Sequence, residues 1–109
     1  MGEDFVEQVL MIVEAIPSGQ VCSYGDIAEI LDCGPRQIGA VMSRYGAAVC
    51  WWRVTNARGE LPAHLLDDAR QEWRSEGVAV SASGTGCCID AHRADLVQIL
   101  QGAHDTMES

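Results

Sequence analysis

Two helix-start patterns that lie close together in the chain limit its fold more than any other feature of the sequence. Ser23 is followed three residues later by Asp26, a capping-box-like pattern that predicts a short helix over residues 24–31. Pro35 fits the first position of a second helix, expected over residues 35–45, because its missing N–H is not needed there. A tight turn that contains glycine joins the two segments, and such a pair of short helices is typical of a helix-turn-helix.

The segments on either side of this pair predict a mainly helical domain with a small β wing. Before it, apolar residues recur at helical spacing over residues 5–16. After it, residues 49–58 are rich in β-branched and aromatic side chains and are expected to be extended. Residues 65–73 then carry the apolar spacing of another helix, which Gly77 is expected to end.

The charge distribution bears on what such a domain could bind. A net charge of −9 is unfavourable for a DNA-binding protein, because phosphate contacts usually need a basic face. In residues 20–62, however, four acidic residues are balanced by four arginines, and the other twelve acidic residues lie outside this segment. Charges beyond a Debye length of about 10 Å are screened. We therefore expect a neutral binding face and weak, strongly salt-sensitive binding to undamaged DNA.

Composition also favours an intracellular chain without a metal or other cofactor. No apolar run reaches the length of a membrane span, and the acidic N-terminal segment lacks a signal-peptide pattern, so a cytoplasmic location is expected. The five cysteines show no disulfide-scaffold spacing and are expected to be free thiols. Cys87, Cys88 and His92 lie near one another, but they lack the number and spacing of ligands that a zinc site needs.

Three motifs occur in a consistent order: Tyr-Gly-Asp-Ile-Ala at residues 24–28, Arg-Gln-Ile-Gly at residues 36–39, and Arg-Val at the end of residues 50–54. Together they resemble the DNA-binding domain of the O6-alkylguanine-DNA alkyltransferases. Those enzymes carry Pro-Cys-His-Arg-Val, in which the Cys accepts the alkyl group. Here Trp51 stands at the position of that Cys and Trp52 at the position of the His. The chain therefore resembles the alkyltransferase-like proteins. These keep the domain that recognises the damaged base but lack alkyl-transfer activity.

The resemblance covers about residues 5–80 and implies the domain organisation. Residues 1–80 are interpreted as a winged-helix-like helix-turn-helix domain of the alkyltransferase DNA-binding type. The small residues of segment 81–86 indicate a linker, and apolar positions between residues 89 and 102 predict one further helix. The role of residues 81–109 is not implied by the resemblance.

The resemblance also implies which residues contact DNA and turn the base out of the helix. Arg36 matches the family arginine that enters the duplex from the minor groove and replaces the flipped base. Tyr24 matches the tyrosine that crowds the phosphate of that nucleotide. Gln37 and Gly39 lie on the same helix, and a helix pressed against DNA needs small residues such as glycine at the closest approach. Taken alone, Arg36 would be a surface arginine and Tyr24 a packed side chain at a helix start.

Met42, Trp51 and Val54 are the candidates that the resemblance gives for the wall of an alkylguanine pocket. Trp51 has no ionisable nucleophile, so it cannot accept an alkyl group, and the chain is expected not to be an enzyme. A flat indole can instead stack on the base, which is worth about 1–3 kcal/mol. Met42 and Val54, taken alone, would be core residues. Either Arg58 or His64 is expected to cover the flipped base.

Trp52 and Arg53 are expected to support this pocket. In an extended segment successive side chains face opposite ways, so Trp51 would face the pocket and Trp52 the body of the domain. Glu76 matches the family glutamate that supports the missing histidine. We therefore expect Glu76 to have no network to serve and to be structural.

These observations favour a monomeric sensor of O6-alkylguanine in double-stranded DNA. It would bind through the minor groove, flip the damaged base, leave the alkyl group in place and flag the site for nucleotide excision repair. One alternative is a helix-turn-helix transcriptional regulator that reads the major groove of undamaged DNA. A second is a residual alkyltransferase that uses Cys50, although the sequence supplies no base to activate this thiol.

Overall fold

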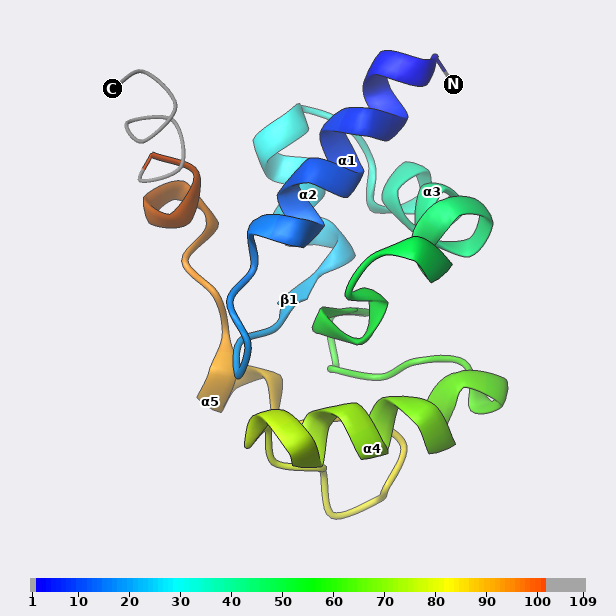
Figure 1. Ribbon diagram of the computed structural model, residues 1–109, viewed down its shortest axis with the longest axis vertical. Helices are drawn as coiled ribbons and strands as arrows, with labels where there is room; N and C mark the ends of the chain where they lie inside the picture. The colour runs from blue at the N-terminus through cyan, green and yellow to red at the C-terminus, as the bar shows by residue number, and fades with distance from the viewer. Residues whose placement is uncertain (1, 102–109) are drawn as a thin grey trace.

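The computed structural model describes residues 2–101, which form a mainly helical molecule around a very small sheet. Helices α1 (Glu3–Ala15), α2 (Tyr24–Leu31) and α3 (Pro35–Tyr45) lie in the upper part of Figure 1. Helix α4 (Leu66–Glu76) lies across the bottom. A two-stranded parallel sheet, β1 (Cys22–Ser23) and β2 (Val54–Thr55), lies between the two parts.

The predicted helix-turn-helix is confirmed, with the predicted bounds. The backbone N–H of Asp26 donates to Ser23 Oγ at 3.2 Å, and the N–H of Ser23 donates to Asp26 Oδ2 at 2.9 Å, which completes the capping box at the start of α2. Pro35 occupies the first turn of α3. Between the helices the chain turns at Asp32, which takes a left-handed conformation with φ of 53°.

The predicted extended segment over residues 49–58 is wrong for most of its length. Residues Trp51–Arg53 form a single 3-10 turn, η2, and only β2 after it is a strand. The side chains of Trp52 and Arg53 both hydrogen-bond to Glu76. Successive side chains of a strand face opposite ways and could not both reach one carboxylate, so these contacts override the strand preference of the sequence.

The hydrophobic core consists of two clusters, one above and one below the sheet. The first joins α1, α2 and α3, and the second packs against α4 around Trp73, which is fully buried. Helix α4 is confirmed at its C-terminal end, where Gly77 takes a left-handed φ of 78°. Within residues 2–101, none of the helices has both the length and the apolar character that crossing a membrane would require.

The single helix predicted over residues 89–102 is wrong within the described residues. Helix α5 (Ile89–His92) ends early, and residues 96–101 form a separate helical segment. Between them the chain is extended, because the backbone of Val21 accepts from Ala94 N at 2.7 Å and donates to His92 O at 2.9 Å. Ile89 belongs to the lower cluster and Leu96 to the upper one, so the segment spans both clusters. Gly102 lies outside the described residues.

Candidate nucleic-acid interface

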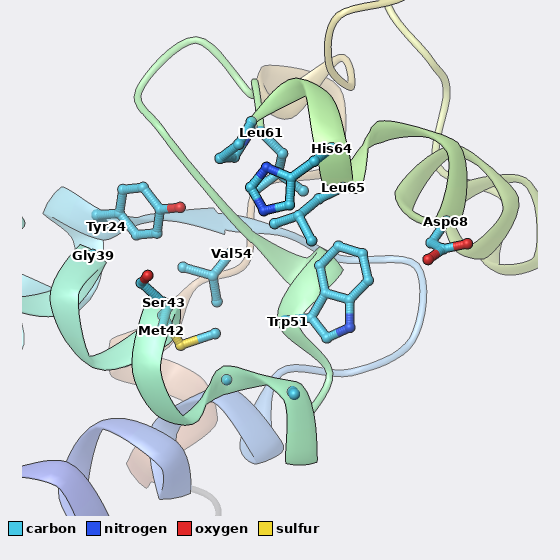
Figure 2. A pocket seen from close by; sticks show the side chains of 13 residues that line it. Tyr24, Gly39, Met42, Ser43, Trp51, Val54, Leu61, His64, Leu65 and Asp68 are labelled. Carbon is cyan, nitrogen blue, oxygen red and sulfur yellow. The ribbon is translucent and has the colours of Figure 1, made fainter.

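A cavity of about 390 Å³ opens between α3, η2 and the start of α4. Figure 2 shows its walls, which come from segments far apart in the sequence. Residues on η3 (Ala63–Leu65) close one side of it. The lining is mostly apolar, with a few polar groups, and consists of Tyr24, Gly39, Met42, Ser43, Gly46, Ala47, Trp51, Val54, Leu61, Pro62, His64, Leu65 and Asp68.

One wall of the cavity comes from the helix-turn-helix. Gly39 and Met42 are three residues apart on α3 and therefore lie on the same face of the helix, beside Val54 of β2. Tyr24, the first residue of α2, points toward them in Figure 2. Burial raises the pKa of the Tyr24 phenol above its ordinary value, so this hydroxyl stays neutral. The structure thus brings together four of the side chains and backbone positions that the sequence singled out.

The opposite wall is the indole of Trp51, which is half-buried and faces the cavity. Trp52 is not part of the lining; its ring lies edge-on to Trp51, with centroids 5.7 Å apart. The predicted directions of the two rings are therefore correct, although the predicted extended backbone is not. A 3-10 turn has three residues per turn and separates neighbouring side chains by about 120°.

Glu76 holds the 3-10 turn in place, and the expectation that it serves no network is wrong. Trp52 Nε1 donates to Glu76 Oε2 at 3.0 Å, and Arg53 Nε donates to Glu76 Oε1 at 3.0 Å. The N–H of Gly19 donates to the same carboxylate, and Arg53 Nη1 donates to Ile16 O at 2.8 Å. Burial acts to raise the pKa of Glu76, but these hydrogen bonds outweigh it and lower the pKa below its ordinary value.

Arg36 and Gln37 lie outside the cavity, exposed on the first turn of α3. Arg36 makes no ion pair within residues 2–101. The side chain of Gln37 accepts a hydrogen bond from Gly34 N at 3.0 Å and thereby satisfies a backbone donor at the helix start. Among the predicted DNA contacts, these two therefore project from the end of α3 while Tyr24 and Gly39 face the cavity.

His64 lines the cavity, whereas Arg58 does not. Arg58 is exposed in a turn in which Asn56 Oδ1 accepts from its backbone N–H at 2.9 Å. Gly59 ends this turn with φ of 82°, and a Cβ there would lie 2.4 Å from Cys87 O. This close approach needs glycine, and it fixes the path of the chain into the segment that carries His64.

Sequence reasoning missed several cavity residues, including Leu61, Leu65 and Asp68. Leu61 precedes η3 and Leu65 is its last residue, and the sequence shows only generic apolar positions there. Asp68 lies in the first turn of α4, where acidic residues are common because they favour the helix dipole. Its place four residues after His64 in a helical segment was the one signal that could have placed it near the cavity.

None of the five cysteines, all of which lie in the described part of the chain, lines the cavity. Cys50 is half-buried directly before η2. Burial raises the pKa of the Cys22 thiol to about 12 and that of Cys87 to about 11, so both stay protonated. Within residues 2–101, no three His, Cys, Asp or Glu side chains converge in a way that could hold a metal ion.

Comparison with known families agrees with this architecture. The family described as "6-O-methylguanine DNA methyltransferase, DNA binding domain" matches residues 4–78. A protein named "DNA base-flipping protein" from Escherichia coli (strain K12) is 40% identical over 88 residues, which cover 75% of this chain and 68% of the relative. The chain belongs to the alkyltransferase-like proteins of this family. A relative of the same name from Vibrio parahaemolyticus is 31% identical over 88 residues, covering 75% of this chain and 88% of its own length.

Solved structures support the fold of this alkyltransferase-like protein. The crystal structure of S. pombe Atl1 in complex with damaged DNA that contains O6-carboxymethylguanine has a TM-score of 0.74 at 24% identity. The matched region covers 87% of this chain and 98% of the Atl1 chain. A structure of S. pombe ATL in complex with DNA has a TM-score of 0.65 at 25% identity. The matched region covers 91% of this chain and 95% of the ATL chain. The mainly helical fold of the alkyltransferase DNA-binding type is thereby confirmed.

Proposed function

We propose that this alkyltransferase-like protein binds double-stranded DNA containing O6-alkylguanine, flips the damaged base into the cavity beside Trp51, and leaves the alkyl group in place. The observation that carries the proposal is the indole of Trp51, which forms a cavity wall at the position where the resemblance puts the acceptor cysteine. Relatives named "DNA base-flipping protein" support the flipping step. The cavity volume of about 390 Å³ lies within the range of about 300–1,000 Å³ found for pockets that bind small organic groups, the class to which a flipped base belongs.

Flipping needs a group that fills the gap in the duplex and a group that displaces the backbone. Arg36 projects from the exposed first turn of α3 and enters the minor groove, where it replaces the extruded base. Tyr24 lines the cavity and crowds the phosphate of the flipped nucleotide. An alkylated guanine pairs poorly and costs less to extrude than an intact base, so the lesion is favoured.

The flipped base is held by stacking and apolar burial. Trp51 packs against the alkylated edge, Met42 and Val54 form the opposite wall, and His64 covers the base from η3. Stacking on an aromatic side chain is worth about 1–3 kcal/mol. Trp51 offers no nucleophile, so the alkyl group stays on the base and the complex persists. A persistent, distorted complex of one protein molecule with DNA is the signal that flags the lesion for nucleotide excision repair.

Lesion binding is tested with paired oligonucleotides that are identical except for one O6-methylguanine. Fluorescence anisotropy with the unaltered protein should show a clear preference for the lesion, and intact-mass analysis afterwards should show no added methyl group. Absence of a preference would contradict the proposal and favour a regulator of undamaged operators. A mass gain of one methyl would show an alkyltransferase, with Cys50 the first thiol to examine.

The roles of single residues are tested with Trp51→Ala and Arg36→Ala. Each should weaken binding to the lesion at least about fivefold, because a stacking contact of about 1 kcal/mol or more is lost in the first and the gap-filling group in the second. Arg74→Ala, at an exposed position on α4, removes the same charge as Arg36→Ala and should bind normally. Normal binding by both Trp51→Ala and Arg36→Ala would overturn the proposal.

A further inference from the structure

The cavity has an unusual charge for a site that receives part of a nucleic acid. Of its lining residues in the described chain, Asp68 alone contributes a carboxylate, and none is an arginine. The Tyr24 phenol stays neutral, which leaves His64 as the one lining side chain able to carry positive charge. Any ligand group that enters the cavity therefore meets one negative charge without a permanent positive charge to offset it.

Asp68 is free to act on such a group. It lies in the exposed first turn of α4 and makes no ion pair within residues 2–101. Its neighbour Asp67 lies in the same exposed turn, but it does not line the cavity and it pairs with Arg70 at 2.5 Å. Figure 2 shows Asp68 beside the indole of Trp51, at the edge of the cavity.

We infer that Asp68 makes this site select lesions by the charge of their alkyl group, so that neutral O6-alkyl groups bind better than groups that end in a carboxylate. The inference rests on the proposed function, which packs the alkyl group against Trp51. Because Asp68 and Trp51 both line the cavity, the far end of a group packed against Trp51 would approach the Asp68 carboxylate, which repels a second negative charge. O6-Carboxymethylguanine, the lesion in the S. pombe Atl1 complex, carries such a carboxylate.

The size of the effect is limited by solvent, because Asp68 is exposed. Like charges several ångströms apart at a protein surface repel by about 1 kcal/mol, which corresponds to roughly a fivefold difference in affinity. We expect binding to O6-carboxymethylguanine to be about three- to tenfold weaker than binding to its uncharged amide counterpart, O6-carbamoylmethylguanine. The two groups have nearly the same size and shape, so the comparison isolates charge.

The experiment measures the affinity of the full chain for duplexes with guanine, O6-methylguanine, O6-carboxymethylguanine or O6-carbamoylmethylguanine at one site. The amide should bind more tightly than the carboxylate, and the ratio should shrink as salt is raised, because salt screens exposed charges. Asp68→Asn should bring the ratio of amide to carboxylate affinity close to one. Asp67→Asn, which removes the same charge one residue away, should keep the ratio of the unaltered protein.

Each result separates the inference from the function on which it rests. If the unaltered protein binds O6-methylguanine but binds amide and carboxylate equally, the inference is wrong and the proposed function stands. The inference also fails if Asp68→Asn leaves the ratio unchanged, or if Asp67→Asn abolishes it. If the protein does not distinguish O6-methylguanine from guanine, both are overturned.

Discussion

Glu76 determines the position of the cavity wall without touching the cavity. Its carboxylate accepts from both Trp52 and Arg53, the two residues that follow Trp51 in the 3-10 turn. Arg53 extends the connection to the end of α1 through the carbonyl of Ile16. The side chains of the ion pair are only 13% and 9% exposed, so the contact is weakly screened by solvent. Loss of this carboxylate therefore affects the whole turn.

We predict that Glu76→Gln lowers the free energy of unfolding by about 2 kcal/mol at neutral pH, the size expected for lost hydrogen bonds to a charged group. The pKa of Glu76 is lowered in the folded protein, so its stabilisation is complete above the ordinary value of 4.5 and is lost as pH falls through the folded value. The difference between the two proteins should therefore shrink in acid. Urea unfolding between pH of about 3 and 7 measures it. Glu14→Gln, at an exposed position on α1, should match the unaltered protein throughout.

Single residues of the site could be predicted only where the motifs reached them. Tyr24, Met42 and Trp51 were chosen through the resemblance, and the structure places all three in the lining of one cavity. Leu61 and Asp68 carry no motif, and their place depends on how the chain folds back from the turn at Gly59. Glu76 was correctly expected to be structural, but its partners depend on a backbone turn that the sequence did not indicate.

Among the elements, α3 carries a glycine that no contact within the described protein requires. A Cβ at Gly39 would meet no heavy atom within 4 Å, so internal packing does not require glycine there. Glycine in the middle of a helix is instead unfavourable, by about 0.5–1 kcal/mol relative to alanine. Gly39 lines the cavity, on the helix that the proposed function presses against DNA. If α3 approaches DNA as proposed, a small residue at this position allows the close contact.

Gly39→Ala should therefore change stability and binding in opposite directions. The free energy of unfolding should rise by about 0.5–1 kcal/mol, because alanine is the better helix former and fits without a clash. Affinity for O6-methylguanine DNA should fall, because the added methyl group lies between α3 and the nucleotide. Thermal unfolding and fluorescence anisotropy on one protein sample measure both effects. A variant that is more stable and binds as tightly as before would show that Gly39 does not approach the DNA.

The elements that the sequence predicted well are those whose signals are local. Both helices of the helix-turn-helix are set by caps within a few residues of their starts, Ser23 with Asp26 and Pro35. The segment around Trp51 was predicted wrongly because its conformation depends on Glu76, which lies 23 residues beyond Arg53 in the chain. Aromatic and β-branched composition favours a strand, but it carries no information about a distant carboxylate.

On the scale of the whole molecule, the segment after residue 80 joins the two core clusters. Cys87 and Ile89 are buried in the lower cluster, and Ala94 and Leu96 in the upper one. The backbone between them pairs with Val21, directly before β1, so it borders the strand that leads into α2. The sequence predicted an extra helix here because apolar spacing does not reveal that its two halves face different clusters. The segment contributes to the core that positions the cavity.

Leu96→Ala tests this contribution in the intact chain. Leu96 is 5% exposed, and truncation of a buried leucine typically lowers the free energy of unfolding by about 2–5 kcal/mol, since apolar contacts are lost and a cavity remains. Val97, the next residue, is 56% exposed, so Val97→Ala should change stability by less than about 0.5 kcal/mol. Urea unfolding of both variants measures the difference.

Equal, small effects would show that residues 87–96 do not pack on the domain in solution, and a fragment of residues 1–80 would then be as stable as the full chain. If Leu96→Ala is strongly destabilising, that fragment should unfold readily, because it would expose the apolar faces that both clusters bury against this segment.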